Sequence, residues 1–147
     1  MGIKNSVYML LIIVALIVSA CGAVKTEESD RDPLAMASLD DMPAEVLAAP
    51  VTVQQAYRFA VANPETLKEI PCYCGCGGMG HTSNYDCYVQ DQDSQGAILY
   101  DTHAIGCSIC VDITLDVMRL QSEGTGLAEI RTYIDDTYAR YGPSNIP

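Results

Sequence analysis

Basic residues are scarce in this chain. Of its 147 residues, 8 are lysine or arginine and 19 are aspartate or glutamate, a formal net charge of −11 at pH 7. Without residues 1–20, whose only charged side chain is Lys4, 7 basic residues face 19 acidic ones and the net charge is −12. Such a surface repels phosphate backbones, so the composition predicts no nucleic-acid partner.

The usual signatures of nucleotide and hydrolytic sites are also missing. The glycine-rich stretch at residues 75–80 has neither the lysine nor the strand-to-helix setting of a phosphate-binding loop. No arrangement of nucleophile, histidine and carboxylate can be identified from spacing. We therefore expect no nucleotide partner and no enzymatic activity, with thiol–disulfide exchange as the one enzymatic alternative.

The chain begins with an apolar run that is too short to span a bilayer. Val7 to Ala20 is uncharged and 14 residues long, against the roughly 20 that a membrane-spanning helix needs. It follows Lys4 and ends in small residues before Cys21, which predicts a secretory signal over residues 1–20. The alternative of an ordinary cleaved signal would leave Cys21 as a free exported thiol.

Residues 18–21, Val-Ser-Ala-Cys, resemble a bacterial lipobox, whose cysteine is lipidated and becomes the mature N-terminus. The resemblance implies a diacyl (palmitate-type) anchor at Cys21. It also implies a location on the extracytoplasmic face of a bacterial cell membrane.

The segment after the signal reads as a spacer. Residues 21–50 are rich in acidic side chains, alanine, serine and proline and have no lasting amphipathic period. They predict a lipidated anchor followed by a flexible acidic tether. Residues 51–147 then form a single small domain, whose modest core would gain from metal or disulfide cross-links.

Apolar spacing within this domain predicts a mainly α fold. One helix is expected over residues 53–61 with Thr52 as its cap, and a short one from Pro64 to Ile70 after Asn63. Two further amphipathic stripes predict an antiparallel pair of helices, the second capped by Thr125. Their apolar positions are Ile109, Ile113, Val117 and Leu120, ending near Gly124, and Leu127, Ile130, Tyr133, Ile134 and Tyr138.

A small β-hairpin is expected between these helices. Residues 87–89 and 97–100 are short β-compatible runs on either side of a polar, turn-like stretch. The predicted architecture is a cysteine-rich loop and a hairpin packed against a helical core.

Six cysteines and two histidines crowd into residues 72–110, and they are the strongest indication of function. Thiolate and imidazole are ligands for soft and borderline metal ions, which predicts a centre for Cu(I) or Zn(II). The candidate ligands are Cys72, Cys74, Cys76, His81, Cys87, His103, Cys107 and Cys110.

Spacing suggests how these ligands are presented. If Asp101 or Thr102 caps a helix, His103, Cys107 and Cys110 share one face of it, at rises of 0, about 6 and about 10.5 Å. Cys107 and Cys110 can then readily bind one ion and His103 less easily the same one, which leaves a pair of sites or a bridged cluster open beside a single ion.

The other ligand group lies in the loop from Cys72 to His81. In an extended chain its three cysteines would be roughly 6.6 Å apart, too far to share one ion, so the segment must curl, as its glycines permit. We expect Met79 to pack and the carboxylate of Asp86 not to bind metal.

The order of these motifs carries a family resemblance. Pro71-Cys72-Tyr73-Cys74-Gly75-Cys76 is followed by His81, Asp86-Cys87-Tyr88, His103-Ala104 and Gly106-Cys107-Ser108-Ile109-Cys110. This arrangement resembles the bacterial lipoproteins named for their PCYCGC motif, over residues 43–147. The resemblance implies an exported, membrane-anchored protein and leaves the function open.

Three functions remain at this point. The first is a lipid-anchored protein that binds Cu(I) or Zn(II) for sequestration, sensing or delivery, with a metal-donor or metal-acceptor protein as partner. The second is an extracellular interaction module stapled by disulfides or by zinc, although adjacent Cys-x-Cys pairs close small, strained rings. The third is a thiol oxidoreductase that uses Cys107 and Cys110. The first accounts for both histidines and is the one we expect.

Overall fold

The computed structural model describes residues 34–146. The predicted signal at residues 1–20, the lipidation of Cys21 and the first part of the tether therefore lie outside the described residues. Within the described part of the chain, no helix is both long enough and apolar enough to cross a bilayer.

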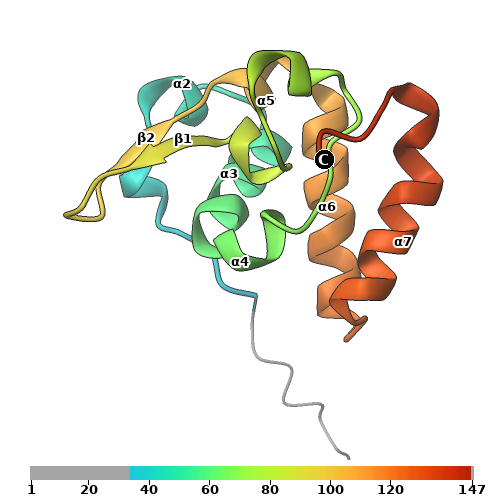
Figure 1. Cartoon of the computed structure of the whole chain (residues 1–147). Helices are drawn as coiled ribbons and strands as arrows, with labels where there is room; N and C mark the ends of the chain where they lie inside the picture. Colours follow the sequence, from blue (N-terminus) through green and yellow to red (C-terminus); the bar gives the residue numbers. More distant parts are fainter. Residues whose placement is uncertain (1–33, 147) are drawn as a thin grey trace, which may run out of the picture. The chain divides into compact units, whose positions relative to one another are not determined.

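The described chain is mainly helical with one two-stranded antiparallel hairpin, which confirms the predicted fold class (Figure 1). The α-helices are α2 (Ala44–Leu47), α3 (Val51–Ala62), α4 (Pro64–Leu67), α5 (His103–Gly106), α6 (Ser108–Ser122) and α7 (Leu127–Tyr138). The strands are β1 (Val89–Gln92) and β2 (Ile98–Tyr100). Short 3-10 turns are η1 (Leu39–Asp41), η2 (Cys76–Met79), η3 (Tyr85–Cys87) and η4 (Ala139–Tyr141).

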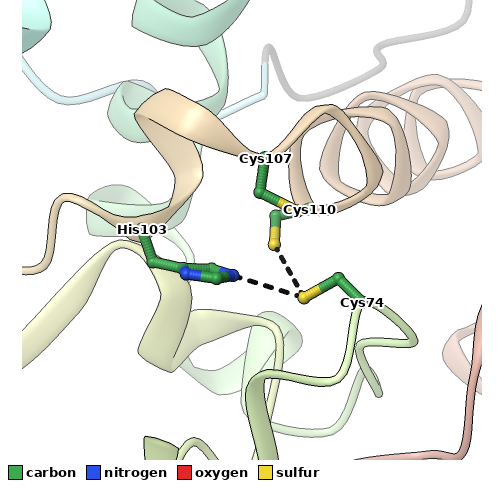
Figure 2. Close-up of side chains that lie close together, drawn as sticks. All are labelled: Cys74, His103, Cys107 and Cys110. Carbon is green, nitrogen blue, oxygen red and sulfur yellow. Dashed lines mark hydrogen bonds between the residues drawn. The ribbon is translucent and has the colours of Figure 1, made fainter.

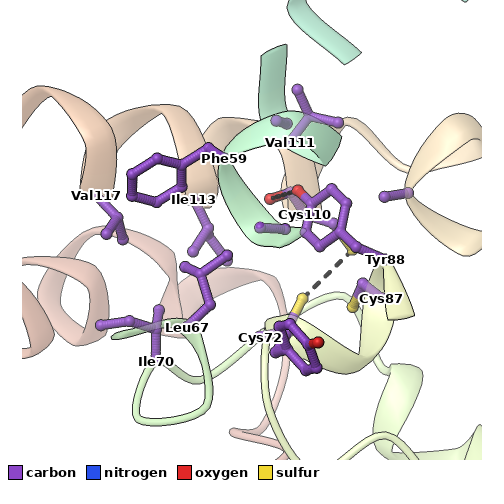
Figure 3. Close-up of a cluster of buried hydrophobic side chains, with 14 of the residues drawn as sticks. Phe59, Leu67, Ile70, Cys72, Cys87, Tyr88, Cys110, Val111, Ile113 and Val117 are labelled. Atoms are coloured by element: carbon purple, nitrogen blue, oxygen red, sulfur yellow. Dashed lines mark hydrogen bonds between the residues drawn. The ribbon is translucent and has the colours of Figure 1, made fainter. Parts of the chain in front are cut away.

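The core lies between α3 and α6, and α7 lies beside α6 (Figure 1). Helix α6 buries Ile113, Val117 and Leu120 along one face, as the apolar spacing predicts, and is followed by Gly124 at φ 83°. Ile113 and Val117 of this face lie near Phe59 of α3 in the buried core (Figure 3). The packed core thus supports the start of α6, where the candidate ligands Cys107 and Cys110 lie.

The stripe on α7 is narrower than predicted. Ile130, Ile134 and Tyr138 are buried, whereas Leu127 and Tyr133 are 41% and 38% exposed. Leu127 is the first residue of the helix, where fewer neighbours cover it, and Tyr133 is rotated by about 100° from Ile134.

The predicted helix caps are corrected at two places. Helix α3 begins at Val51 after Pro50 and α7 begins after Gly126, and neither has a side-chain cap, so Thr52 and Thr125 do not serve as one. The proline start of α4 after Asn63 is confirmed, but α4 ends at Leu67, before Ile70.

The folded unit begins earlier than the predicted boundary at residue 51. Met42 and Val46 lie four residues apart and are buried in the core. Ala37 exchanges hydrogen bonds with Arg58: its amide donates to the Arg58 carbonyl, and its own carbonyl accepts from Nε of Arg58. The tether predicted over residues 21–50 therefore does not extend over residues 34–50, because two apolar side chains at helical spacing anchor this segment.

The hairpin is present, with shifted strands. Val89 pairs with Tyr100 and Gln92 with Ile98, with an irregularity between Val89 and Asp91. Cys87, which was predicted to start the first strand, instead lies in the 3-10 turn η3 and is fully buried. The turn directs this thiol into the molecule, where the other cysteines lie.

Candidate metal centre

Seven of the eight predicted ligands come together in two adjacent groups. We call Cys74, His103, Cys107 and Cys110 the accessible group, and Cys72, Cys76 and Cys87 the buried group. Within each group the potential ligand atoms all lie within 4.8 Å of one another. All six of these cysteines are free thiols. The arrangement could hold metal ions, as the residue pattern predicts.

The cysteine loop curls as the sequence requires. Gly75 at φ 85° and Gly80 at φ 94° flank the 3-10 turn η2, in a left-handed conformation that glycine adopts without steric cost. The curl distributes the three cysteines of the motif unequally. Cys74 goes to the accessible group, and Cys72 and Cys76 go to the buried group.

In the accessible group, Cys74 is the central contact (Figure 2). Its sulfur lies 3.3 Å from Nε2 of His103 and 3.5 Å from the sulfur of Cys110. A tetrahedral Zn(II) ion with bonds of about 2.3 Å needs ligand atoms about 3.8 Å apart. Small outward movements would therefore admit an ion among one imidazole and three thiols.

The helix predicted from His103 onward is interrupted at Cys107. This residue has extended backbone angles, φ −125° and ψ 101°, and separates α5 from α6 as the N-cap of α6. The prediction of one continuous helical face is therefore wrong. The break also removes the 10 Å axial spread that a continuous helix would impose, so His103, Cys107 and Cys110 converge on Cys74.

The buried group lies at the end of the apolar core (Figure 3). The sulfurs of Cys76 and Cys87 are 3.7 Å apart. The sulfur of Cys72 lies 3.4 Å from that of Cys74 and 3.5 Å from that of Cys110, so it touches the accessible group. The two groups are therefore parts of one continuous centre.

The thiols of this centre shift one another's pKa values. Hydrogen bonds with Cys110, and then with Cys76 and Cys87, lower the pKa of Cys72 well below its usual range. The hydrogen bond with Cys72 raises the pKa of Cys110, and the hydrogen bond with Cys110 raises that of Cys87. Burial, followed by the charge of Cys72, raises the pKa of Cys74. Loss of a proton from one thiol therefore makes loss from its neighbours harder, and a cation bound among them would offset this repulsion.

A buried polar network holds the backbone of Cys110. The Tyr88 hydroxyl donates to the Cys110 carbonyl at 2.8 Å, and the Thr114 hydroxyl lies 2.7 Å from that of Tyr88. Oδ1 of Asn84 accepts from the Thr114 hydroxyl at 2.7 Å, and all three side chains are buried. The sequence analysis missed this network. Its only sequence signal is the position of Asn84 and Tyr88 on either side of Asp86-Cys87.

The C-terminal segment supports the loop from the other side, although the sequence suggested no chemistry there. Oδ1 of Asn145 accepts from the amide of Cys72 at 2.6 Å, and its Nδ2 donates to the Ser83 carbonyl and lies 3.6 Å from the sulfur of Cys76. The chain reaches this position past Gly142, where a Cβ would lie 2.8 Å from the Tyr73 carbonyl oxygen. The tail therefore fixes both ends of the Cys72–Cys76 stretch.

His81 lies next to the centre but outside both groups. Its ring packs edge-on against His103 with centroids 5.4 Å apart, and its Nε2 lies 3.4 Å from Oδ2 of Asp101. Nδ1 is buried and has no hydrogen-bond partner among the described residues. This is the arrangement of a ligating histidine whose other nitrogen faces a carboxylate, so ligation by His81 stays a prediction.

Asp101 interacts with both histidines. Its Oδ1 accepts from the backbone amide of His103 at 2.7 Å while Oδ2 faces His81. Asp101 and His81 line a surface depression of about 320 Å³, together with Met79 and Asp86. Met79 is 58% exposed there, so the expectation that it packs is wrong. The Asp86 carboxylate accepts hydrogen bonds from Thr82 and from the Ser83 amide, so it stabilises the turn before η3.

Comparison with known proteins adds the family. No curated protein and no solved structure matches the chain. The sequence profile of the family described as "Protein of unknown function with PCYCGC motif" matches residues 10–146, and the chain belongs to this family.

Proposed function

We propose that this protein binds soft or borderline metal ions, Cu(I) or Zn(II), while anchored by a lipid on Cys21 to the extracytoplasmic face of a bacterial membrane. The observation that carries the proposal is the convergence of six free thiols and one imidazole from three separate parts of the chain. They come from the cysteine loop, from η3 and from the α5–α6 junction. The donor contacts of 3.3–3.7 Å are slightly shorter than the separation of about 3.8 Å in a tetrahedral thiolate site, so small outward movements would admit an ion.

Exchange of the metal with another protein is favoured by the exposure of one group. Cys74, His103 and Cys107 are only partly buried, so a ligand on a second protein can approach an ion held there. Sequestration, sensing and delivery all need such access. A metal-donor or metal-acceptor protein is the partner that this surface fits, and no enzymatic step is part of the proposal.

The burial of Cys72, Cys76 and Cys87 favours a second candidate function, a zinc-stapled interaction module. Closed zinc sites stabilise small domains and exchange their metal slowly. The two functions use the same ligands and differ in the rate at which the metal leaves. Competition with a soluble chelator under stopped flow separates them.

Elemental analysis with a parallel thiol count tests the proposal. The full chain, exported and purified in detergent without a histidine tag or chelator, should carry stoichiometric copper or zinc, with six thiols reactive only after denaturation and chelation. A metal-free protein without titratable thiols would contain disulfides, and the proposal would then be wrong.

Membrane fractionation tests the anchor separately. Cys21→Ser should move the protein from the membrane to the soluble exported fraction without changing its metal content. A Cys21→Ser protein that stays in the membrane fraction contradicts lipidation at this residue.

A further inference from the structure

The position of Cys110 has a consequence for how many ions the centre holds. Its sulfur lies 3.5 Å from Cys74, in the accessible group, and 3.5 Å from Cys72, in the buried group. Cys110 therefore faces ligands of both groups.

The number of donors also points to Cys110. The accessible group has four ligand atoms, enough for one tetrahedral ion, whereas the buried group has three. A closed tetrahedral thiolate site needs a fourth ligand. Cys110 is fully buried and can supply it from inside the protein, whereas Cys74 lies on the solvent side and already contacts His103.

If all six thiols bind metal, the charge of the centre favours more than one divalent ion. Metal-bound cysteines are thiolates, so the six thiols together carry −6 once they have given their protons to solvent. One divalent ion would leave −4 and two would leave −2. An uncompensated buried charge is costly, and no lysine or arginine is among the residues that contact these sulfurs in the described chain.

We propose that the centre binds two metal ions that share the thiolate of Cys110. One ion is bound by Cys74, His103, Cys107 and Cys110, and the other by Cys72, Cys76, Cys87 and Cys110. The polar network of Asn84, Tyr88 and Thr114 holds the Cys110 backbone so that its sulfur faces both sites. This proposal rests on the proposed metal-binding function and specifies its stoichiometry and bridging ligand.

Cadmium NMR tests the bridge directly. The full chain in detergent is stripped of metal and titrated with ¹¹³Cd(II), a soft ion with the thiolate preference of zinc and a nuclear spin of one half. We expect two equivalents to bind and to give two signals of different chemical shift. A scalar coupling between the two ¹¹³Cd nuclei is expected, because one sulfur is bonded to both.

Each other outcome refutes a different statement. Two signals without coupling would mean two separate sites and would overturn the bridge. One signal and one equivalent would overturn the two-ion centre while leaving metal binding intact. No bound cadmium would refute the proposed function itself.

A matched pair of serine variants identifies the bridging residue. Cys110→Ser should abolish the coupling and reduce tight binding from two equivalents to one, whereas Cys107→Ser should weaken one ion and keep the coupling at saturating cadmium. Circular dichroism checks that each variant keeps its helices. Loss of the coupling in Cys74→Ser and its retention in Cys110→Ser would assign the bridge to Cys74 and overturn the proposal.

Discussion

The two halves of the metal centre differ in their access to solvent. Cys72 and Cys87 are 0% exposed and Cys76 is 2% exposed, whereas Cys74, His103 and Cys107 are only partly buried. The buried half continues the apolar core, and the accessible half is built on a break between two helices. An ion in the first would act as part of the fold, and an ion in the second can be reached by a partner.

Removal of all metal should have the largest effect, because the buried half depends on it. A ligand present at a thousandfold its Kd stabilises by about 4 kcal/mol, which corresponds to a change in Tm of roughly 10–20 °C for a domain of this size. Differential scanning calorimetry before and after dialysis against a chelator measures this change. An unchanged Tm would show that the buried group contributes to the fold without metal.

One substitution in each half sharpens the comparison. Cys87→Ser should lower both the affinity for metal and the Tm of the metal-loaded protein, because it opens a site inside the core. Cys107→Ser should weaken binding of one ion about 10-fold or more with a smaller change in Tm, since this thiol is only partly buried. Chelator competition and calorimetry on both variants separate the two effects. Equal losses of Tm would remove the distinction between the halves.

The accessible half should also depend on Asp101, whose carboxylate accepts from the backbone amide of His103 and faces the ring of His81. Asp101→Asn keeps the size of the side chain but removes its charge, and we expect metal affinity to fall by about 10-fold. Asp86→Asn is the matched control, because this carboxylate stabilises a turn and should leave affinity within about twofold. Competition titrations with the same chelator compare the two variants. A larger loss in Asp86→Asn would mean that the depression beside His81 binds metal through Asp86.

Loss of the contacts between the C-terminal tail and the buried half should have the smallest effect on metal binding and should act on stability instead. Asn145→Ala removes hydrogen bonds to Cys72 and Ser83 and should cost about 1–3 kcal/mol in the free energy of unfolding. Urea denaturation of the metal-loaded protein measures this cost. A variant with unchanged stability would show that the tail rests on the loop without holding it.

Local patterns in the sequence predicted much of the helical core. Ile113, Val117 and Leu120 form the buried face of α6. Apolar side chains that recur with the helical period of 3.6 residues lie on one side of a helix, so a helix can bury all of them together. The proline after Asn63 starts α4, and Gly75 and Gly80 permit the turn that the three clustered cysteines need. Helix caps were less predictable. Thr52 and Thr125 have the right chemistry, but Thr52 is the second residue of α3, and Thr125 lies one residue before the N-cap Gly126 of α7.

Local patterns could not predict which ligands join the accessible group and which join the buried group. A continuous helix from His103 fits the local spacing of the ligands, although Gly106 is a poor helix former. The structure breaks the helix at Cys107, and His103 contacts Cys74. Asn145 is 73 residues from Cys72, and nothing local to the tail indicates that contact.

The sequence by itself determined which atoms are available: six clustered thiols, two imidazoles, the glycines that let the loop curl and the apolar faces of the helices. Those properties belong to single residues or to one turn of chain. The tertiary structure alone decided that Cys72, Cys76 and Cys87 are buried, that Cys74 joins His103, and that Cys110 lies between the two groups. Such assignments depend on contacts between segments far apart in the chain, whose energies are known only once the core has packed.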